Sequence, residues 1–226
     1  MTRRFSLCTL VAAAALLASC ETVPPIPPSP PTLEFVRSDC AAVPDLSSAI
    51  SLTPDKERAV HFVSAPASSD TGCIVRDGQQ TPYALFALPA DFDDKTMTVG
   101  STFEPLRILS PNVVILDGRG EVSRTFDAAD YMYRGSVYSV QFRPRPNEAY
   151  VLVTADPSRV GRRYDSIAIG VVTTQVYTGY GTANVYSGTD VAQSRTFSYE
   201  GVVQVMVNDT DTEEKNATAA PVPAGP

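Results

Sequence analysis

The chain has 226 residues, of which 43% are hydrophobic and 19% are charged, so most of it is expected to fold rather than to stay disordered. Its 18 basic and 25 acidic side chains give a net charge of −7. This acidic balance argues against nucleic acid as a partner, because phosphate backbones are bound by clustered Lys and Arg.

The first segment, residues 1–19, has the features of an export signal. Arg3 and Arg4 precede an apolar run, Phe5–Ala18, which at about fourteen residues is shorter than the roughly 20 that cross a bilayer. Leu17-Ala18-Ser19-Cys20 resembles a bacterial lipobox, which implies that Cys20 becomes the mature N-terminus and carries lipid. An ordinary signal in which Cys20 is incidental is the alternative. Glu21, in place of the Asp typical of inner-membrane retention, favours anchoring in the outer membrane, facing the periplasm.

Residues 20–32 then form a lipidated Cys and a Pro-rich tether, with six Pro between positions 24 and 31. Polyproline II rises about 3.1 Å per residue, so the twelve residues after Cys20 reach at most ~37 Å. A ligand for a Pro-recognising module is the alternative reading. Removing residues 1–19 leaves a net charge of −9, so the lipid, rather than electrostatic attraction, is expected to hold the chain on the membrane.

Two further cysteines, Cys40 and Cys73, remain after export and lipidation. Two thiols left over in an exported chain are expected to pair as a disulfide. A metal or redox pair is the alternative, although the sequence has no Cys-x-x-Cys spacing and only one His, His61.

The region 33–207 contains short segments rich in Val, Tyr, Phe, Ile and Thr, separated by Gly and Pro. The apolar run Val113–Leu116 suits a strand buried on both faces, and Asp117–Gly120 suits a hairpin tip before residues 121–126. The predicted strands are Ala59–Ser64, Pro82–Leu88, Thr96–Phe103, Asn112–Asp117, Ser136–Phe142, Ala149–Thr154, Ser166–Val176 and Thr196–Val207.

No window keeps a helical apolar stripe over three turns, although Leu46–Ile50 and Asp127–Met132 each suit one short helix. The pattern therefore predicts an all-β fold, an antiparallel β-sandwich of the immunoglobulin-like or jelly-roll-like kind. Residues 208–226 have almost no bulky apolar side chains and predict a disordered tail.

Catalytic patterns are sparse. His61 lies on a predicted strand, and no Gly-x-Ser-x-Gly elbow is present to offer a nucleophile. Acidic pairs such as Asp127 and Asp130 could be the two carboxylates of a glycoside hydrolase, but Asp residues at such positions are also typical of turns. The acidic run Asp91–Asp94 does not match a calcium loop. The sequence therefore predicts neither an enzyme nor a metal or cofactor.

Tyrosine supplies the candidate binding residues, in two groups. Amphipathic rings can cover a sugar face or a partner protein while the hydroxyl stays in water, and core packing in the sandwich is the alternative role. The first group is Tyr131, Tyr133, Arg134 and Tyr138, and the second is Tyr177 and Tyr180 in a Gly- and Thr-rich stretch.

One family resemblance covers about half of the mature chain. The segments Tyr83–Ala90, Pro111–Asp117 and Tyr150–Val153, with a weaker echo at Ser194–Gly201, resemble the maltose operon periplasmic protein family. The resemblance implies a periplasmic, non-enzymatic accessory to carbohydrate uptake and brings no catalytic residues with it. The lipobox and the short tail distinguish this chain from the family pattern.

The resulting hypothesis is a lipid-anchored periplasmic protein that assists maltose- or maltodextrin-type transport by contacting an envelope transport protein or a glycan. The alternative is a structural or assembly lipoprotein of the outer membrane with no sugar role. A glycan-cleaving enzyme is a more distant third.

Overall fold

The computed structural model describes residues 27–56, 59–177 and 182–209, and nearly all of its regular structure is strand. Two short 3-10 helices are present in these ranges, η2 (Leu46–Ser48) and η3 (Ala128–Asp130). No helix in the described residues is long and apolar enough to cross a membrane. The strands are β1 (Ile50–Ser51), β2 (Val60–Ala67), β3 (Cys73–Arg76), β4 (Gln79–Ala87), β5 (Lys95–Thr102), β6 (Arg107–Leu109), β7 (Pro111–Asp117), β8 (Val122–Thr125), β9 (Met132–Arg134), β10 (Val137–Phe142), β11 (Glu148–Ala155), β12 (Arg163–Tyr177), β13 (Thr182–Ser198) and β14 (Gly201–Asp209).

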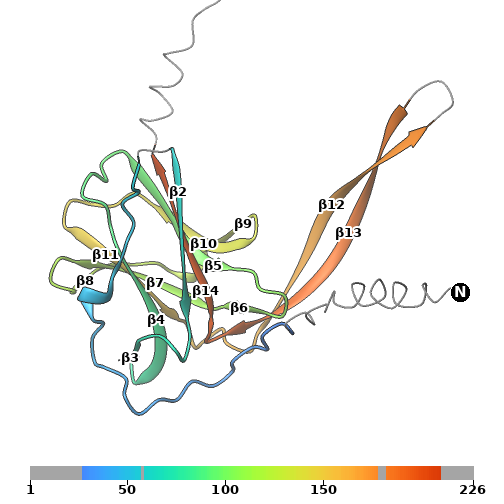
Figure 1. The fold of residues 1–226 in the computed structure, drawn as a ribbon. Helices are drawn as coiled ribbons and strands as arrows, with labels where there is room; N and C mark the ends of the chain where they lie inside the picture. The colour runs from blue at the N-terminus through green and yellow to red at the C-terminus, as the bar shows by residue number, and fades with distance from the viewer. Residues whose placement is uncertain (1–26, 57–58, 178–181, 210–226) are drawn as a thin grey trace, which may run out of the picture.

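Two sheets form the body of the molecule (Figure 1). The six-stranded sheet runs in the order β1-β4-β11-β7-β8, with β3 paired to β4, and the five-stranded sheet runs β2-β14-β5-β10-β9. Pairing within them is antiparallel except for the short parallel contact between β1 and β4. The all-β, antiparallel sandwich predicted from the sequence is therefore confirmed.

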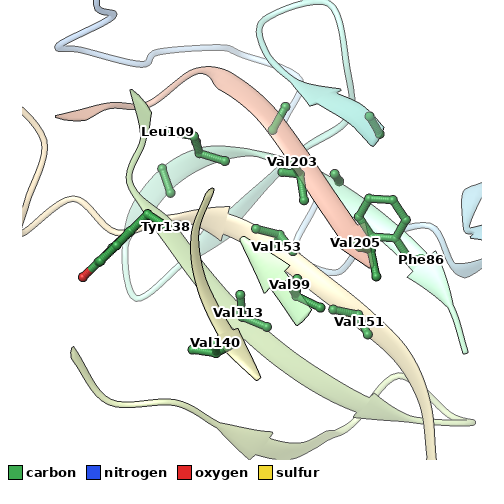
Figure 2. Close-up of a cluster of buried hydrophobic side chains, with 14 of the residues drawn as sticks. Phe86, Val99, Leu109, Val113, Tyr138, Val140, Val151, Val153, Val203 and Val205 are labelled. Carbon is green, nitrogen blue, oxygen red and sulfur yellow. The ribbon is translucent and has the colours of Figure 1, made fainter. Parts of the chain in front are cut away.

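The main core lies between these two sheets, and Figure 2 shows its side chains meeting from both sides. Alternate residues of each strand point inward, as the period of two requires. Along β14, Val203, Val205 and Val207 are almost fully buried, whereas the residues between them are half-buried. The six-stranded sheet contributes the facing Phe86 and Val153.

A second, smaller apolar cluster covers the outer face of the six-stranded sheet. It contains Leu85, Val114 and Leu152, and Leu46 of η2 packs against it. Strand β7 is therefore buried on both faces, which confirms the prediction from the apolar run Val113–Leu116.

Strands β12 and β13 form a long two-stranded arm that projects from the body (Figure 1). They pair antiparallel from Arg163↔Thr196 to Tyr177↔Thr182, and β13 pairs with β6 through Thr196–Ser198 at the base. The sequence prediction placed one strand over Thr196–Val207, and this is wrong. The chain leaves β13 at Ser198, turns through residues 199–200 and enters β14 at Gly201.

The predicted disulfide between Cys40 and Cys73 is present and closes a sequence separation of 33 residues. Beside it, Ala41 forms a parallel bridge with Ile74, so the bond fixes the N-terminal segment against β3. At the other end, β14 continues through Asp209, which extends the sheet two residues beyond the expected domain boundary at 207.

Candidate functional site

An aromatic cluster at the base of the arm brings together the first group of predicted Tyr residues. Tyr131 follows η3, and Tyr138 lies on β10 with Val140 and Phe142 on the same inward face. The Tyr131 and Tyr138 rings stack with centroids 5.4 Å apart, and each residue is only 7% exposed. The Tyr131 hydroxyl accepts a hydrogen bond of 2.7 Å from the Val113 N–H. Both residues therefore pack inside the sandwich.

Arg159, in the turn after β11, supplies the charge of this cluster. Its guanidinium carbon lies 5.0 Å from the Tyr131 ring centroid and 5.3 Å from that of Tyr138, and it donates a hydrogen bond to the Tyr138 hydroxyl. Its Nε atom lies 2.9 Å from Asp156 Oδ2. Burial is the largest single influence on Arg159 and opposes its charge, but the hydrogen bond to Asp156 and the electrostatic attraction of Asp156, Tyr138 and Tyr131 together raise the pKa of the guanidinium. Burial also raises the pKa of the Tyr131 hydroxyl, which therefore stays protonated.

Tyr133 forms the outer part of the cluster and is 40% exposed. Its ring stacks on Tyr164 of β12 with centroids 3.9 Å apart and an interplanar angle of 11°. Phe103 packs against both rings, with centroids 5.9 Å and 5.7 Å away, and Arg195 of β13 lies over Phe103 at 4.7 Å. The cluster therefore holds the start of β12 and the end of β13 against the five-stranded sheet.

The other predicted binding residues lie elsewhere. Arg134 donates to the Ser139 carbonyl at 2.7 Å, so its guanidinium is used to join β9 to β10. Tyr177 is 77% exposed at the far end of the arm, well away from the cluster. Tyr180 and Cys20 lie outside the described residues.

Sequence reasoning missed Arg159, Tyr164 and Phe103 as members of this cluster. The signal that could have indicated Arg159 is its spacing from Asp156, because an acid followed three residues later by Arg suits a turn closed by an ion pair. No local pattern connects Tyr164 with Tyr133, since their contact depends on where β12 leaves the body.

The N-terminal segment is held beside the base of the arm. Thr32 donates its N–H to Ser198 Oγ at 2.9 Å, and its carbonyl accepts from the Tyr199 N–H at 2.9 Å. The Thr32 hydroxyl donates to Glu200 at 3.1 Å. The chain preceding Thr32 therefore reaches the body at the junction of β13 and β14.

A hollow of about 260 Å³, lined mainly by residues of polar type, lies at one end of the outer face of the six-stranded sheet. Its floor includes Thr154, which is fully buried and whose hydroxyl has no hydrogen-bond partner among the described residues. Arg76, Asn112, Gln79 and Ser158 are among the residues that line it. This combination of donors and acceptors suits a small polar ligand.

Among the residues that the structure describes, no group of three or more His, Cys, Asp or Glu side chains could hold a metal ion. Comparison with models of protein families, with curated proteins and with solved structures found no match for this chain.

Proposed function

We propose that the protein is a lipid-anchored component of the bacterial envelope that binds a partner rather than transforming a substrate. The lipobox-like segment ending at Cys20 and the Pro-rich tether support the anchor. The projecting β12–β13 arm supports a binding role, because a long exposed strand pair is a surface for recognition.

The observation that carries the proposal is that tether and arm leave the body at the same place. Thr32 forms hydrogen bonds with Ser198 and Tyr199, at the end of β13. The tether from Glu21 to Thr32 reaches at most ~37 Å in polyproline II. The arm, taken from Ser166 to Tyr177, is about 36 Å long at about 3.3 Å per residue. An anchored body therefore holds its arm within reach of the membrane surface and of proteins embedded there.

The test is to express the full chain and its Cys20→Ser variant in a bacterium and to separate membrane from soluble fractions. The unsubstituted protein is expected in the membrane fraction, released only by detergent, with a mass that shows loss of residues 1–19 and added acyl groups. Ser19→Thr is a control that leaves the thiol in place. Recovery of the unsubstituted protein as a soluble, unmodified chain would contradict the proposal.

A second candidate is the carbohydrate-uptake role that the family resemblance implies. The hollow beside β3 and β11 favours it, since Arg76, Gln79 and Asn112 offer the mixed donors and acceptors that a sugar hydroxyl needs. Titration calorimetry with maltotriose is expected to detect binding that Arg76→Ala weakens. Arg119→Ala, on the exposed β7–β8 turn, is the matched control. Absence of heat with maltose, maltotriose and longer maltodextrins would remove this candidate.

A further inference from the structure

Over Arg163–Tyr177 and Thr182–Ser198, the part of the arm that the structure describes, the outer edges are unpaired over most of their length. In the described residues, β12 pairs only with β13, and β13 pairs elsewhere only with β6 at Thr196–Ser198. Each free edge of an antiparallel ribbon leaves every second N–H and C=O pointing outward. The arm thus offers two rows of backbone donors and acceptors, one on either side.

The sequence of the arm has almost none of the features that protect exposed edges. Natural edge strands are blunted by Lys and other charges, by Pro or by bulges. From Ser166 to Gln193 the chain contains no Lys, Arg, Glu or Pro, and Asp190 is its one charged residue. The register from Ser166↔Gln193 to Tyr177↔Thr182 runs without a shift. A two-stranded ribbon alone is marginally stable in water, so a third and fourth strand would stabilise it.

We infer that the occupant of these edges is a second copy of this chain, with β12 of one copy pairing antiparallel with β13 of the next. The strand polarities fit, because β12 runs away from the body and β13 returns to it. Copies that project their arms in the same direction therefore bring an outgoing edge against a returning edge. This common orientation is what the proposed membrane anchor would impose, and the inference rests on that proposal to this extent.

The area available decides how many edges each copy uses. An edge about 36 Å long and about 10 Å thick buries roughly 360 Å² per partner. A stable interface buries about 800 Å² per partner, so one edge alone is too small to hold a dimer. A copy that uses both edges has two such contacts, with two different neighbours, and roughly 720 Å² of its surface is buried in total. Each copy therefore pairs on both sides, and a head-to-tail contact of this kind closes into a ring when its rotation allows.

The aromatic cluster prepares the arm for this assembly. The stack of Tyr133 on Tyr164 and the buried Arg195 over Phe103 fix the base of both strands to the body. Fixing the direction of the arm before association lowers the ordering cost that association has to overcome.

The test measures the mass of the purified full chain in detergent by native mass spectrometry, together with hydrogen exchange of the arm. The expected result is an assembly of three or more copies in which nearly all arm amides are protected. The double variant Thr174→Lys/Gln175→Lys places charge on successive exposed positions of β12 and is expected to give monomers. Thr53→Lys/Gln141→Lys changes the same residue types at exposed positions off the arm and is expected to keep the assembly.

A monomer for the unsubstituted chain, or an assembly that survives the β12 lysines, would overturn the inference. If the lysine variant does not fold, a shortened chain replaces it, in which Asn-Gly joins Asp165 to its register partner Ser194 in place of residues 166–193. Loss of assembly then supports the inference, and its persistence overturns it. Fractionation and mass measurement of the unsubstituted chain separate the two proposals: an anchored monomer defeats only the inference, and an unanchored assembly defeats only the anchor.

Discussion

Glu148 carries a buried carboxylate that depends on Arg124. The Glu148 side chain is fully buried and that of Arg124 is 18% exposed, with Arg124 Nη2 lying 2.8 Å from Glu148 Oε2. The Arg124 guanidinium also lies over the rings of Phe126 and Phe142, at 5.3 Å and 5.0 Å. The only other hydrogen bond to the carboxylate in the described residues comes from the Arg145 N–H, at 2.9 Å.

The substitution Arg124→Met keeps an apolar stem against the two rings and removes the charge. It leaves the carboxylate of Glu148 buried with a single backbone donor, and breaking a buried pair in this way costs about 3–5 kcal/mol. Domains of this kind are stable by about 5–15 kcal/mol, so the loss is a large fraction of the total. For a domain of 150–250 residues it corresponds to a fall in Tm of about 6–20 °C.

Urea unfolding followed by circular dichroism measures this loss. The matched control is Arg119→Met on the neighbouring turn, where Arg119 is 78% exposed and its partner Glu121 70% exposed, and where the expected change is below about 0.5 kcal/mol. The double variant Arg124→Met/Glu148→Met is expected to recover most of the stability, because an apolar pair replaces a buried ionic one. A single variant as stable as the control, or a double variant less stable than the single, would refute the reasoning.

Three further predictions concern stability. The variant Cys40→Ser/Cys73→Ser removes a bond that closes 33 residues and is expected to lower the free energy of unfolding by about 3–4 kcal/mol, measured by urea unfolding against the oxidised protein. Gly100→Ala would place a Cβ atom 2.1 Å from a backbone oxygen of β10, and we expect a loss of about 1–3 kcal/mol in thermal unfolding, whereas Gly118→Ala meets nothing within 4 Å and should be neutral. Burial opposes ionisation of Asp156, but hydrogen bonds lower the pKa of its carboxyl group below the ordinary value. The ionised carboxylate therefore stabilises the fold above about pH 4, and this stabilisation is lost as the pH falls through the folded-state pKa. The stability difference between the unsubstituted protein and Asp156→Asn should therefore shrink in unfolding curves recorded from pH 6 down to pH 3, and a constant difference would contradict this assignment.

The sandwich was predictable because its core strands carry strong local patterns. The continuous apolar run Val113–Leu116 indicates burial on both faces, and the alternation at Val203, Val205 and Val207 indicates one buried face. Both patterns can be read from a few neighbouring residues, and the structure confirms the burial that each of them indicates.

Strands without such signals were missed. Strands β3, β6 and β9 have three or four residues each, too few for an alternation to stand out. Most of β13 was missed for another reason: its sequence from Thr182 to Asp190 contains Asn, Ser, Gly and Asp, which are typical of turns. Its strand conformation comes from the ladder with β12, a tertiary effect that overrides local preference.

At the candidate site, residue type alone does not distinguish a buried Tyr from a ligand-binding Tyr. Tyr138 alternates with Val140 and Phe142 in the sequence, a pattern that favours an inward side chain, and the structure places it inward. Its amphipathic ring favoured a ligand contact equally well, because a Tyr hydroxyl can find water or a buried donor such as Arg159. Arg159 comes from a turn 21 residues away in sequence, so only the folded chain brings the two together.

Tyr133, the exposed residue of the aromatic cluster, connects the cluster to the arm. Of the aromatic residues first predicted as ligand contacts, Tyr131 and Tyr138 are buried, so replacing either by Ala would reduce stability before it reported on binding. Tyr133 remains 40% exposed, and its ring stacks on Tyr164 where β12 leaves the body. Its substitution by Ala should therefore loosen the base of the arm, whereas Tyr133→Phe should keep the stack. Faster hydrogen exchange at the start of β12 in Tyr133→Ala alone would show that this residue acts by positioning the arm, and equal exchange in both variants would assign it no such role.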